Sequence, residues 1–200
     1  MKKILICSVF LFVTLISAFK QDAEERYVVD VERSSVKWLA KKILGQHSGS
    51  VKLSSGSLML NGSNLVSGTF AMNMTSIDCD DLDDGSNQML TDHLKSVDFF
   101  SVAKNPISTF RITKVMPLST DQATIMGNLT IKGITAPVTF TASIRKQNNM
   151  IVATAKNIKV DRTKYNIRYR SANFFGDLGD KAIENQFELS VTLVARLSVS

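Results

Sequence analysis

The segment that decides the fold reads Gly127-Asn128-Leu129-Thr130-Ile131-Lys132-Gly133-Ile134-Thr135-Ala136-Pro137-Val138-Thr139-Phe140. Leu129 and Ile131 alternate with polar residues in its first half, and Val138 and Phe140 alternate with threonines in its second half. Gly133 lies between the halves, where the chain can reverse. The pattern predicts a β-hairpin with one apolar and one polar face. Its register is strongly fixed, because a shift of one residue would turn the apolar side chains to water.

The chain from Tyr27 onward repeats this alternation. Strands are expected over residues 27–31, 36–40, 51–53, 57–60 and 69–75, around Phe110 and Ile112, and over residues 150–160 and 187–197. Between Asp78 and Val97, apolar residues instead recur at helical spacing, which predicts one short helix with Ser86 as its N-cap. About eight antiparallel strands and one helix indicate an all-β fold. Periodicity alone leaves both a closed barrel and a sandwich open.

The N-terminus has the pattern of an export signal. A basic start, Met1-Lys2-Lys3, precedes a mostly apolar run from Ile4 to Phe19, which is short for a membrane span. We expect residues 1–20 to be a signal peptide and residues 21–200 to form a single domain, periplasmic or secreted. That domain contains one cysteine, Cys79, so we expect no internal disulfide.

No catalytic or metal site is expected from the motifs. The acidic run Asp78–Gly85 does not have the spacing of a calcium loop, since its twelfth position from Asp80 is Thr91 where a glutamate is needed. The only histidines are His47 and His93, and neither belongs to a hydrolase or metalloprotease motif. Cys79 is expected to be a lone thiol with no basic residue near it. The chain is therefore predicted not to be an enzyme.

Basic residues also alternate with apolar ones between Arg162 and Arg170. We interpret this stretch as a half-buried strand with a polar face, because the chain has no nucleic-acid-binding motif. Lys and Arg exceed Asp and Glu by 24 to 18, which is only weak evidence for an anionic partner. No nucleic-acid partner is expected.

Four segments resemble, in order, the YceI-like family of secreted bacterial proteins. They are Tyr27–Trp38 with Gly45–Gly49; His93–Phe100 followed by Asn105, Pro106 and Phe110; Gly127–Val138, which fits the pattern Gly-x-Leu-Thr-x-Lys-Gly-x-Thr-x-Pro-Val; and Asp161-Arg162. The resemblance extends from Tyr27 to the C-terminus. It departs at Asn166, where the family often has glycine. Because asparagine tolerates a left-handed backbone, we expect that turn to be kept.

The resemblance implies an elongated lipocalin-like β-barrel of about eight strands that holds a long polyisoprenoid or isoprenoid quinone. The residues expected to line the ligand site are Trp38, His47, Phe70, Met72, Met74, Phe99, Phe100, Phe110, Ile112, Leu129, Ile131, Phe140 and Phe187. Two readings of His47 stay open: an anchor for its own glycine-rich turn, or a polar group at the cavity mouth. A fully packed core is the alternative for the whole set, since a small barrel can be filled by its side chains.

Three functions follow as hypotheses. The first is an exported carrier that transports, stores or sequesters an isoprenoid lipid, with no cofactor other than that bound ligand. The second is an enzyme that acts on such a lipid, and the third is a packed structural barrel. Transient membrane contact is compatible with the first. Sequence does not determine the oligomeric state, and a homodimer stays open.

Overall fold

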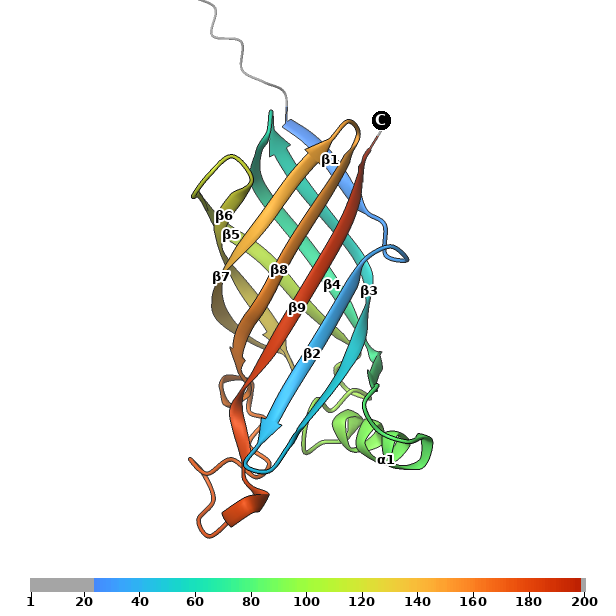
Figure 1. Cartoon of the computed structure of the whole chain (residues 1–200), viewed down its shortest axis with the longest axis vertical. Coiled ribbons are helices and arrows are strands. Elements are labelled where there is room, and N and C mark those ends of the chain that lie inside the picture. Colours follow the sequence, from blue (N-terminus) through green and yellow to red (C-terminus); the bar gives the residue numbers. More distant parts are fainter. Residues whose placement is uncertain (1–23, 199–200) are drawn as a thin grey trace, which may run out of the picture.

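One antiparallel sheet closes on itself to form an elongated barrel (Figure 1). The computed structural model describes residues 24–198. The strands are β1 (Glu24–Val29), β2 (Ser35–Lys42), β3 (Gln46–Asn61), β4 (Asn64–Cys79), β5 (Ile107–Pro117), β6 (Gln122–Ile131), β7 (Ile134–Gln147), β8 (Met150–Asp161) and β9 (Ile183–Leu197). The helices are α1 (Asp84–Lys95) and the 3₁₀ turns η1 (Arg162–Tyr165) and η2 (Gly179–Lys181). The expected all-β barrel with one α-helix is confirmed, while the expected signal peptide lies outside the described residues.

Nine strand segments occupy eight positions around the barrel. β1 and β2 follow one another along the same position, because both pair with β3 on one side and with β9 on the other. Ser34 braces the break between them: its hydroxyl donates to the Asp30 carbonyl at 2.7 Å and accepts from the Val194 amide at 3.0 Å. The barrel wall is thereby continuous although the chain leaves it briefly.

The predicted hairpin is confirmed as β6 and β7. Ile131 pairs with Ile134, and the two turn residues, Lys132 and Gly133, have φ values of 52° and 72°. Such positive values belong to a type I′ turn, whose twist matches that of the flanking strands. Counting from the hydrogen-bonded pair that closes the hairpin, Pro137 occupies a non-hydrogen-bonded position opposite Asn128. Its missing amide proton therefore costs this ladder nothing.

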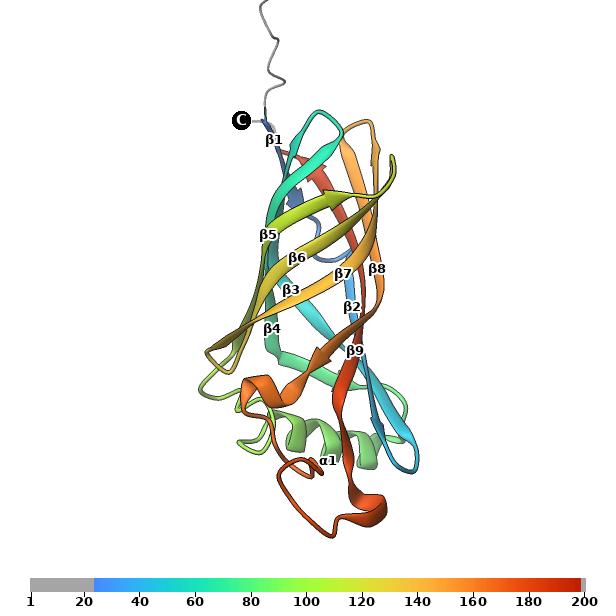
Figure 2. The same cartoon turned by 90° about the vertical axis from the view of Figure 1, so that its left-hand side faces the viewer.

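The helix begins three residues earlier than predicted. Asp83, not Ser86, is the N-cap, and its carboxylate accepts a hydrogen bond from the Ser86 amide at 3.0 Å. A carboxylate at this position satisfies a free amide and also interacts favourably with the helix dipole. α1 lies across the lower end of the barrel (Figures 1 and 2), and no helix among residues 24–198 has the length and apolarity needed to span a membrane.

The segment after β8 does not continue as the predicted strand. It forms η1 and then turns across the lower end of the barrel before β9 begins (Figure 2). Asn166 ends η1 with φ 58° and ψ 32°, so the expected left-handed turn is present. The basic residues of this stretch therefore do not lie on one face of a strand. Arg162 in particular is only 5% exposed.

The pairing around the barrel is uneven. β8 and β9 pair over ten registered positions, whereas β7 and β8 pair over five, Ser143–Gln147 with Met150–Thr154. Below that short seam the two strands are not paired with each other. β8 also contains a bulge after Ala155, with Asn157 at φ 55°. The bulge shifts its inward-facing phase from Ala155 to Ile158.

Candidate functional site

The upper half of the barrel encloses an apolar cavity, here called the upper cavity. It has about 840 Å³ of empty volume, including space that opens to solvent. Its lining residues are Val36, Leu53, Leu58, Leu65, Phe70, Met72, Phe110, Ile112, Ile125, Leu129, Val138, Phe140, Ala142, Ile144, Ala153, Thr154, Ala155, Ile158, Val160, Leu189, Val191 and Leu193. Thr154 is the one polar residue among them. A lining that is apolar almost throughout is typical of sites that hold hydrophobic ligands.

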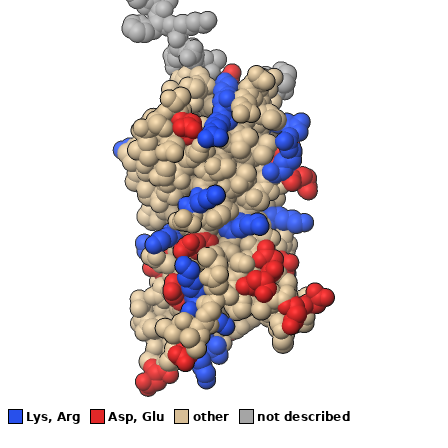
Figure 3. All heavy atoms as spheres, in the orientation of Figure 1, with Lys and Arg blue, Asp and Glu red and all other residues tan. Residues whose placement is uncertain are grey.

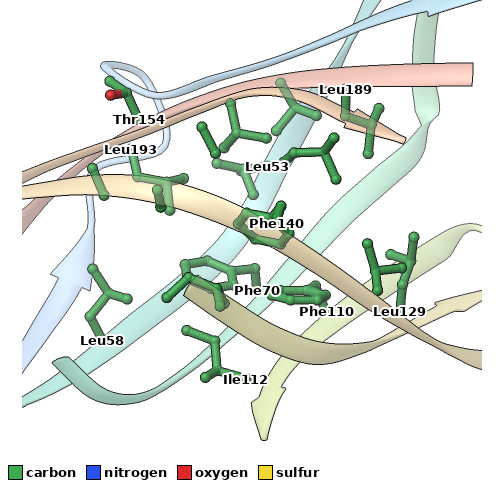
Figure 4. Close-up of a pocket in the computed structure, with 18 of the residues that line it drawn as sticks. Leu53, Leu58, Phe70, Phe110, Ile112, Leu129, Phe140, Thr154, Leu189 and Leu193 are labelled. Atoms are coloured by element: carbon green, nitrogen blue, oxygen red, sulfur yellow. The ribbon is translucent and has the colours of Figure 1, made fainter. Parts of the chain in front are cut away.

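Three phenylalanines form an aromatic cluster in this cavity. The Phe110 ring centroid lies 6.4 Å from that of Phe70 and 5.6 Å from that of Phe140 (Figure 4). Gly127 makes the room for it, because a Cβ atom at this position would lie 2.3 Å from Cζ of Phe110. The opening glycine of the hairpin motif therefore lets an aromatic ring lie flat against the wall. Flat rings of this kind suit a slim apolar ligand.

A second cavity, here called the lower cavity, continues toward α1 and has about 850 Å³ of empty volume, again including space open to solvent. Its lining residues are Val36, Trp38, Ala40, Val51, Met72, Met74, Ile77, Leu94, Phe99, Phe100, Ser108, Leu129, Ile131, Arg162, Ile167, Ile183, Glu184, Phe187 and Leu189. Val36, Met72, Leu129 and Leu189 line both cavities. The two spaces therefore meet in series along the barrel axis.

Arg162 is the buried cation of the lower cavity. Its guanidinium donates four hydrogen bonds to backbone carbonyls, from Nε to Glu184 at 2.9 Å, from Nη1 to Ile167 at 3.0 Å and Tyr169 at 2.9 Å, and from Nη2 to Ile183 at 2.9 Å. Burial lowers the pKa of Arg162, and the nearby Asp161 carboxylate opposes that shift. The side chain thus ties the turn after η1 to the start of β9 and closes this end of the barrel.

Twelve of the thirteen predicted site residues line one or both cavities. Phe70, Phe110, Ile112 and Phe140 line the upper cavity; Trp38, Met74, Phe99, Phe100, Ile131 and Phe187 line the lower; Met72 and Leu129 line both. Phe99 and Phe100 reach the same cavity because the segment after α1 turns: the Phe100 amide donates to the Leu94 carbonyl at 3.1 Å. In an extended chain two consecutive side chains point to opposite faces, whereas this turn lets both reach the cavity.

His47 is the thirteenth, and it lines neither cavity. It is the second residue of β3 and not part of a turn, and its Nδ1 lies 3.4 Å from Oδ1 of Asp81. The same oxygen accepts a hydrogen bond from the Cys79 thiol at 2.9 Å. The sequence-based expectation that Cys79 has no basic neighbour is wrong, because strand pairing brings β3 beside the end of β4. The pKa of Cys79 is raised to about 11, mainly because the thiol is buried and secondly because of its hydrogen bond to Asp81.

Asp81 is itself held as a carboxylate. Burial opposes its ionisation, but hydrogen bonds from Cys79, His47 and the Ser48 amide together lower the pKa of Asp81. A thiol with so high a pKa is a poor nucleophile at neutral pH. The cluster is therefore not arranged as a cysteine-based catalytic pair.

His93, the second histidine, is partly exposed and packs one side of its ring against two aromatic residues. Its ring lies 5.0 Å from that of Phe99 and 4.7 Å from that of Tyr169, both edge-on. Nε2 lies 3.0 Å from Oδ2 of Asp98. These contacts fix the turn that carries Phe99 into the lower cavity.

Sequence reasoning missed the lining residues of β8 and of the segment after it. Ala153, Ala155 and Ile158 follow the alternation of a half-buried strand, but two of them are small and the bulge breaks the period. Arg162 was missed for a different reason. Its alternation with apolar neighbours mimics the polar face of a strand, and no motif shows that carbonyls of the following turn and of β9 will surround it.

A family model described as YceI-like domain matches residues 27–195. The chain belongs to the YceI-like family. Curated relatives include a UPF0312 protein of Pseudomonas paraeruginosa, 49% identical over 57 residues, and Protein YceI of Salmonella arizonae, 44% identical over 57 residues. Each alignment covers 28% of this chain and 29% of the relative.

Solved structures show the same fold at low sequence identity. BcnA of Burkholderia cenocepacia matches with a TM-score of 0.67 and 19% identity, over 83% of this chain and 98% of that one. A domain of Saccharophagus degradans, described as a polyisoprenoid binding domain implicated in plant cell wall breakdown, matches with a TM-score of 0.63 and 9% identity, over 86% and 98%. The YceI-like barrel is therefore retained in this chain.

Proposed function

We propose that this YceI-like protein is a non-catalytic carrier that holds one long isoprenoid lipid inside its barrel. The observation that carries the proposal is the pair of apolar cavities, which meet at Met72 and Leu129 and together run along the barrel interior. A long, slim chain matches two adjacent cavities that share lining residues. The neighbour named as a polyisoprenoid binding domain, which has the same fold, supports this choice of ligand class.

Chain length should dominate the affinity. Burial of one methylene group is worth about 0.8 kcal/mol, so about ten of them supply roughly 8 kcal/mol before the costs of binding. Roughly 8 kcal/mol corresponds to a dissociation constant near 1 μM. Because the upper cavity has only Thr154 as a polar residue, each added isoprene unit there gains free energy with no competing polar contact. Head-group changes should alter affinity much less than chain shortening.

Arg162 suggests which end of the barrel receives the head group. A guanidinium has five N–H donors, and four hydrogen bonds from Arg162 are identified among the described residues. The remaining N–H, on Nη2, is available to an oxygen of a quinone, phosphate or hydroxyl group in the lower cavity. The isoprenoid tail would then extend upward past Met72 and into the aromatic cluster.

The arrangement of ionisable groups favours a carrier over an enzyme. Arg162 uses four of its five N–H groups on backbone carbonyls, and the carboxylate of Asp81 and the thiol of Cys79 lie outside both cavities. A general acid or base must lie within hydrogen-bond reach of the reacting atom. Among the residues that line the lower cavity, Glu184 alone has a carboxylate. One carboxylate without a paired acid, base or nucleophile gives little support for catalysis.

Export and membrane contact complete the proposal. The signal-like pattern of residues 1–20 supports a periplasmic or secreted carrier, and intact mass of the exported protein will show whether the leader is removed. A water-insoluble ligand must be collected from a membrane. Ile43 and Leu44, at the tip of the β2–β3 hairpin, are 62% and 65% exposed, and Met89 of α1 is 70% exposed. These apolar side chains at the lower end support brief contact with a lipid surface there.

The test combines mass spectrometry of an organic extract with a variant that narrows the junction of the two cavities. Wild-type protein should release an isoprenoid lipid. Met72→Trp should remain folded after delipidation and carry a shorter chain or none, because its added volume conflicts with the ligand. Thr69→Trp, an exposed position on the same strand, is the matched control and should carry the wild-type lipid.

A packed barrel predicts the opposite pair of results. In a filled core, Met72→Trp would cost about 1 to 3 kcal/mol of lipid-free stability, and the wild-type extract would contain no lipid. That combination would overturn the carrier proposal.

A further inference from the structure

We propose that His47, Cys79 and Asp81 form a binding site for one zinc ion. The site lies on the outside of the two cavities, where β3 meets the end of β4 and the loop that leads into α1. One ring nitrogen of His47, Sγ of Cys79 and a carboxylate oxygen of Asp81 all lie within 4.8 Å of one another. This proposal does not depend on the ligand carried by the barrel.

Two of the three separations between the donor atoms lie within about half an ångström of those around a tetrahedral ion, and the third, between Sγ of Cys79 and the His47 ring nitrogen, is within 4.8 Å. An ion at about 2.0 Å from nitrogen and oxygen and about 2.3 Å from sulfur places its ligand atoms roughly 3.3 to 3.6 Å apart. Nδ1 of His47 already lies 3.4 Å from Oδ1 of Asp81, and Sγ of Cys79 lies 2.9 Å from that oxygen. The shorter distance is that of a thiol hydrogen bond. Replacement of the thiol proton by the ion would lengthen it by about half an ångström, which a side-chain rotation can supply.

The backbone around the three donors is held in place. Cys79 pairs with Gly49 across the β3–β4 ladder, and its amide donates to Oγ1 of Thr91 on α1 at 3.2 Å. The Ser48 amide donates to Oδ2 of Asp81 at 3.1 Å, which leaves Oδ1 directed at the thiol and the imidazole. Oδ2 therefore positions the carboxylate through its hydrogen bond with the Ser48 amide, and Oδ1 is left to bind the ion. Support of this kind orients metal ligands in known sites.

The exposure of the donors allows an ion to enter. Cys79 is fully buried, whereas the side chains of His47 and Asp81 are 27% and 29% exposed. The ion would therefore be bound from the solvent side, with water in its fourth position. Asp80, whose carboxylate bonds to the Ser48 hydroxyl at 3.0 Å, adds negative charge beside the site and favours a cation.

The donor types select the kind of ion. A thiolate and an imidazole disfavour calcium and magnesium, which prefer oxygen ligands. One sulfur, one nitrogen and one oxygen with an open fourth position fit zinc, which combines these three donors readily. The neighbouring acidic run does not itself supply the site, since Asp81 is the single carboxylate that contributes a donor to it.

Zinc binding should brace the lower end of the barrel. The three donors come from β3, from the last residue of β4 and from the loop before α1, so an ion would cross-link the wall to the helix that closes the lower cavity. A ligand that binds only the folded state stabilises it in proportion to the logarithm of its concentration. At about a hundredfold excess over Kd, zinc should raise the melting temperature by roughly 5 to 10 °C in a domain of this size.

The experiment uses full-length protein freed of metal by a chelator and then titrated with Zn²⁺ or with Co²⁺ as a spectroscopic substitute. Wild type should bind one ion, and the cobalt form should show a thiolate-to-cobalt charge-transfer band together with tetrahedral visible bands. His47→Gln and Asp81→Asn should each weaken binding at least tenfold. Cys79→Ala should abolish the charge-transfer band.

His93→Gln is the matched control. His93 also contacts a carboxylate, Asp98 at 3.0 Å, but no thiol belongs to that pair, so this variant should bind like wild type. Because His47 and Asp81 are partly exposed, their variants should stay folded even where Cys79→Ala does not. The proposal is overturned if wild type binds zinc no more tightly than His47→Gln, if His93→Gln loses as much affinity, or if bound cobalt shows no thiolate band.

Discussion

The two cavities are built from different kinds of structure. The upper cavity is walled by paired strands, and its lining side chains are apolar except for Thr154. The lower cavity adds α1, the turn after it and the η1 segment, and its lining includes Ser108, Arg162 and Glu184. Strand pairing thus supplies a uniform apolar interior, while connecting segments supply an end with polar groups. A ligand with a long tail and a small head matches this difference.

The largest expected effect comes from Arg162→Met, which removes the guanidinium that holds the lower end closed. Four carbonyls would lose their donor, one buried (Ile167) and three partly buried, and each unsatisfied buried group costs about 1 to 3 kcal/mol. Since some of these carbonyls can turn to water, we expect a loss of about 4 kcal/mol, measured by urea unfolding. Arg168→Met is the control, because Arg168 is exposed and lies over the Phe174 ring at 4.5 Å. Equal losses in both variants would show that Arg162 has no special structural role.

Phe99→Ala should destabilise the lower end by about 3 kcal/mol, as is typical for a buried phenylalanine. Its ring contacts those of His93 and Tyr169 at centroid distances of 5.0 and 5.3 Å. Phe174→Ala, at a position 45% exposed, should change the unfolding free energy little. If Phe99→Ala melts like wild type, the turn after α1 does not depend on this packing.

Gly127→Ala should affect the upper cavity instead. The new Cβ would lie 2.3 Å from Cζ of Phe110 and 2.7 Å from the Arg111 carbonyl oxygen, so the wall or the ring must shift. Overpacking of this kind costs about 1 to 3 kcal/mol. Adding Phe110→Leu to the Gly127→Ala variant should restore the share of the lost stability that is due to the clash with the ring. A double-mutant cycle measures that share. Gly176→Ala, with no atom within 4 Å of the new Cβ, is the neutral control, and a similar loss there would contradict the steric explanation.

The smallest effect concerns the N-cap of α1. Hydrogen bonds from Ser86 lower the pKa of Asp83 below its ordinary value of 3.8. The carboxylate form is the one stabilised, so its contribution is present at neutral pH and is lost as the pH falls through the lowered value. Asp83→Ala should therefore melt slightly below wild type at pH 7, with the difference disappearing in acid. Asp83→Asn keeps an acceptor without a titrating charge. A difference in melting temperature between wild type and Asp83→Ala that persists in strong acid would contradict a stabilising role for the ionised Asp83 carboxylate.

The strands and the all-β class were predictable from local sequence signals, whereas the choice of a barrel over a sandwich came from the family resemblance. The alternation of Leu129 with Ile131 and the reversal at Gly133 fix a hairpin without reference to the rest of the chain. Non-local features were not predictable in this way. The shared position of β1 and β2 and the bulge near Asn157 depend on how distant strands align, and no local pattern encodes that alignment.

In the candidate site too, residues with a local sequence signal were predicted and residues that depend on distant contacts were missed. Large apolar residues such as Phe70, Met72 and Phe140 were predicted to face inward, and they line the cavities. Polar members were missed, since Arg162 lies in a stretch whose alternation resembles a strand. The proximity of His47 to Cys79 was also missed, because it arises only from the register of β3 with β4. Side chains that act through long-range partners require the tertiary structure.

The short seam between β7 and β8 has a kinetic consequence. Five registered positions join these strands, as many as join β4 and β5, against ten between β8 and β9. Local opening requires less free energy where fewer backbone hydrogen bonds and contacts must break. Amide hydrogen exchange along this seam should therefore proceed by brief local opening, well below the free energy of global unfolding. A barrel that can part at one seam can exchange its contents much faster than it unfolds.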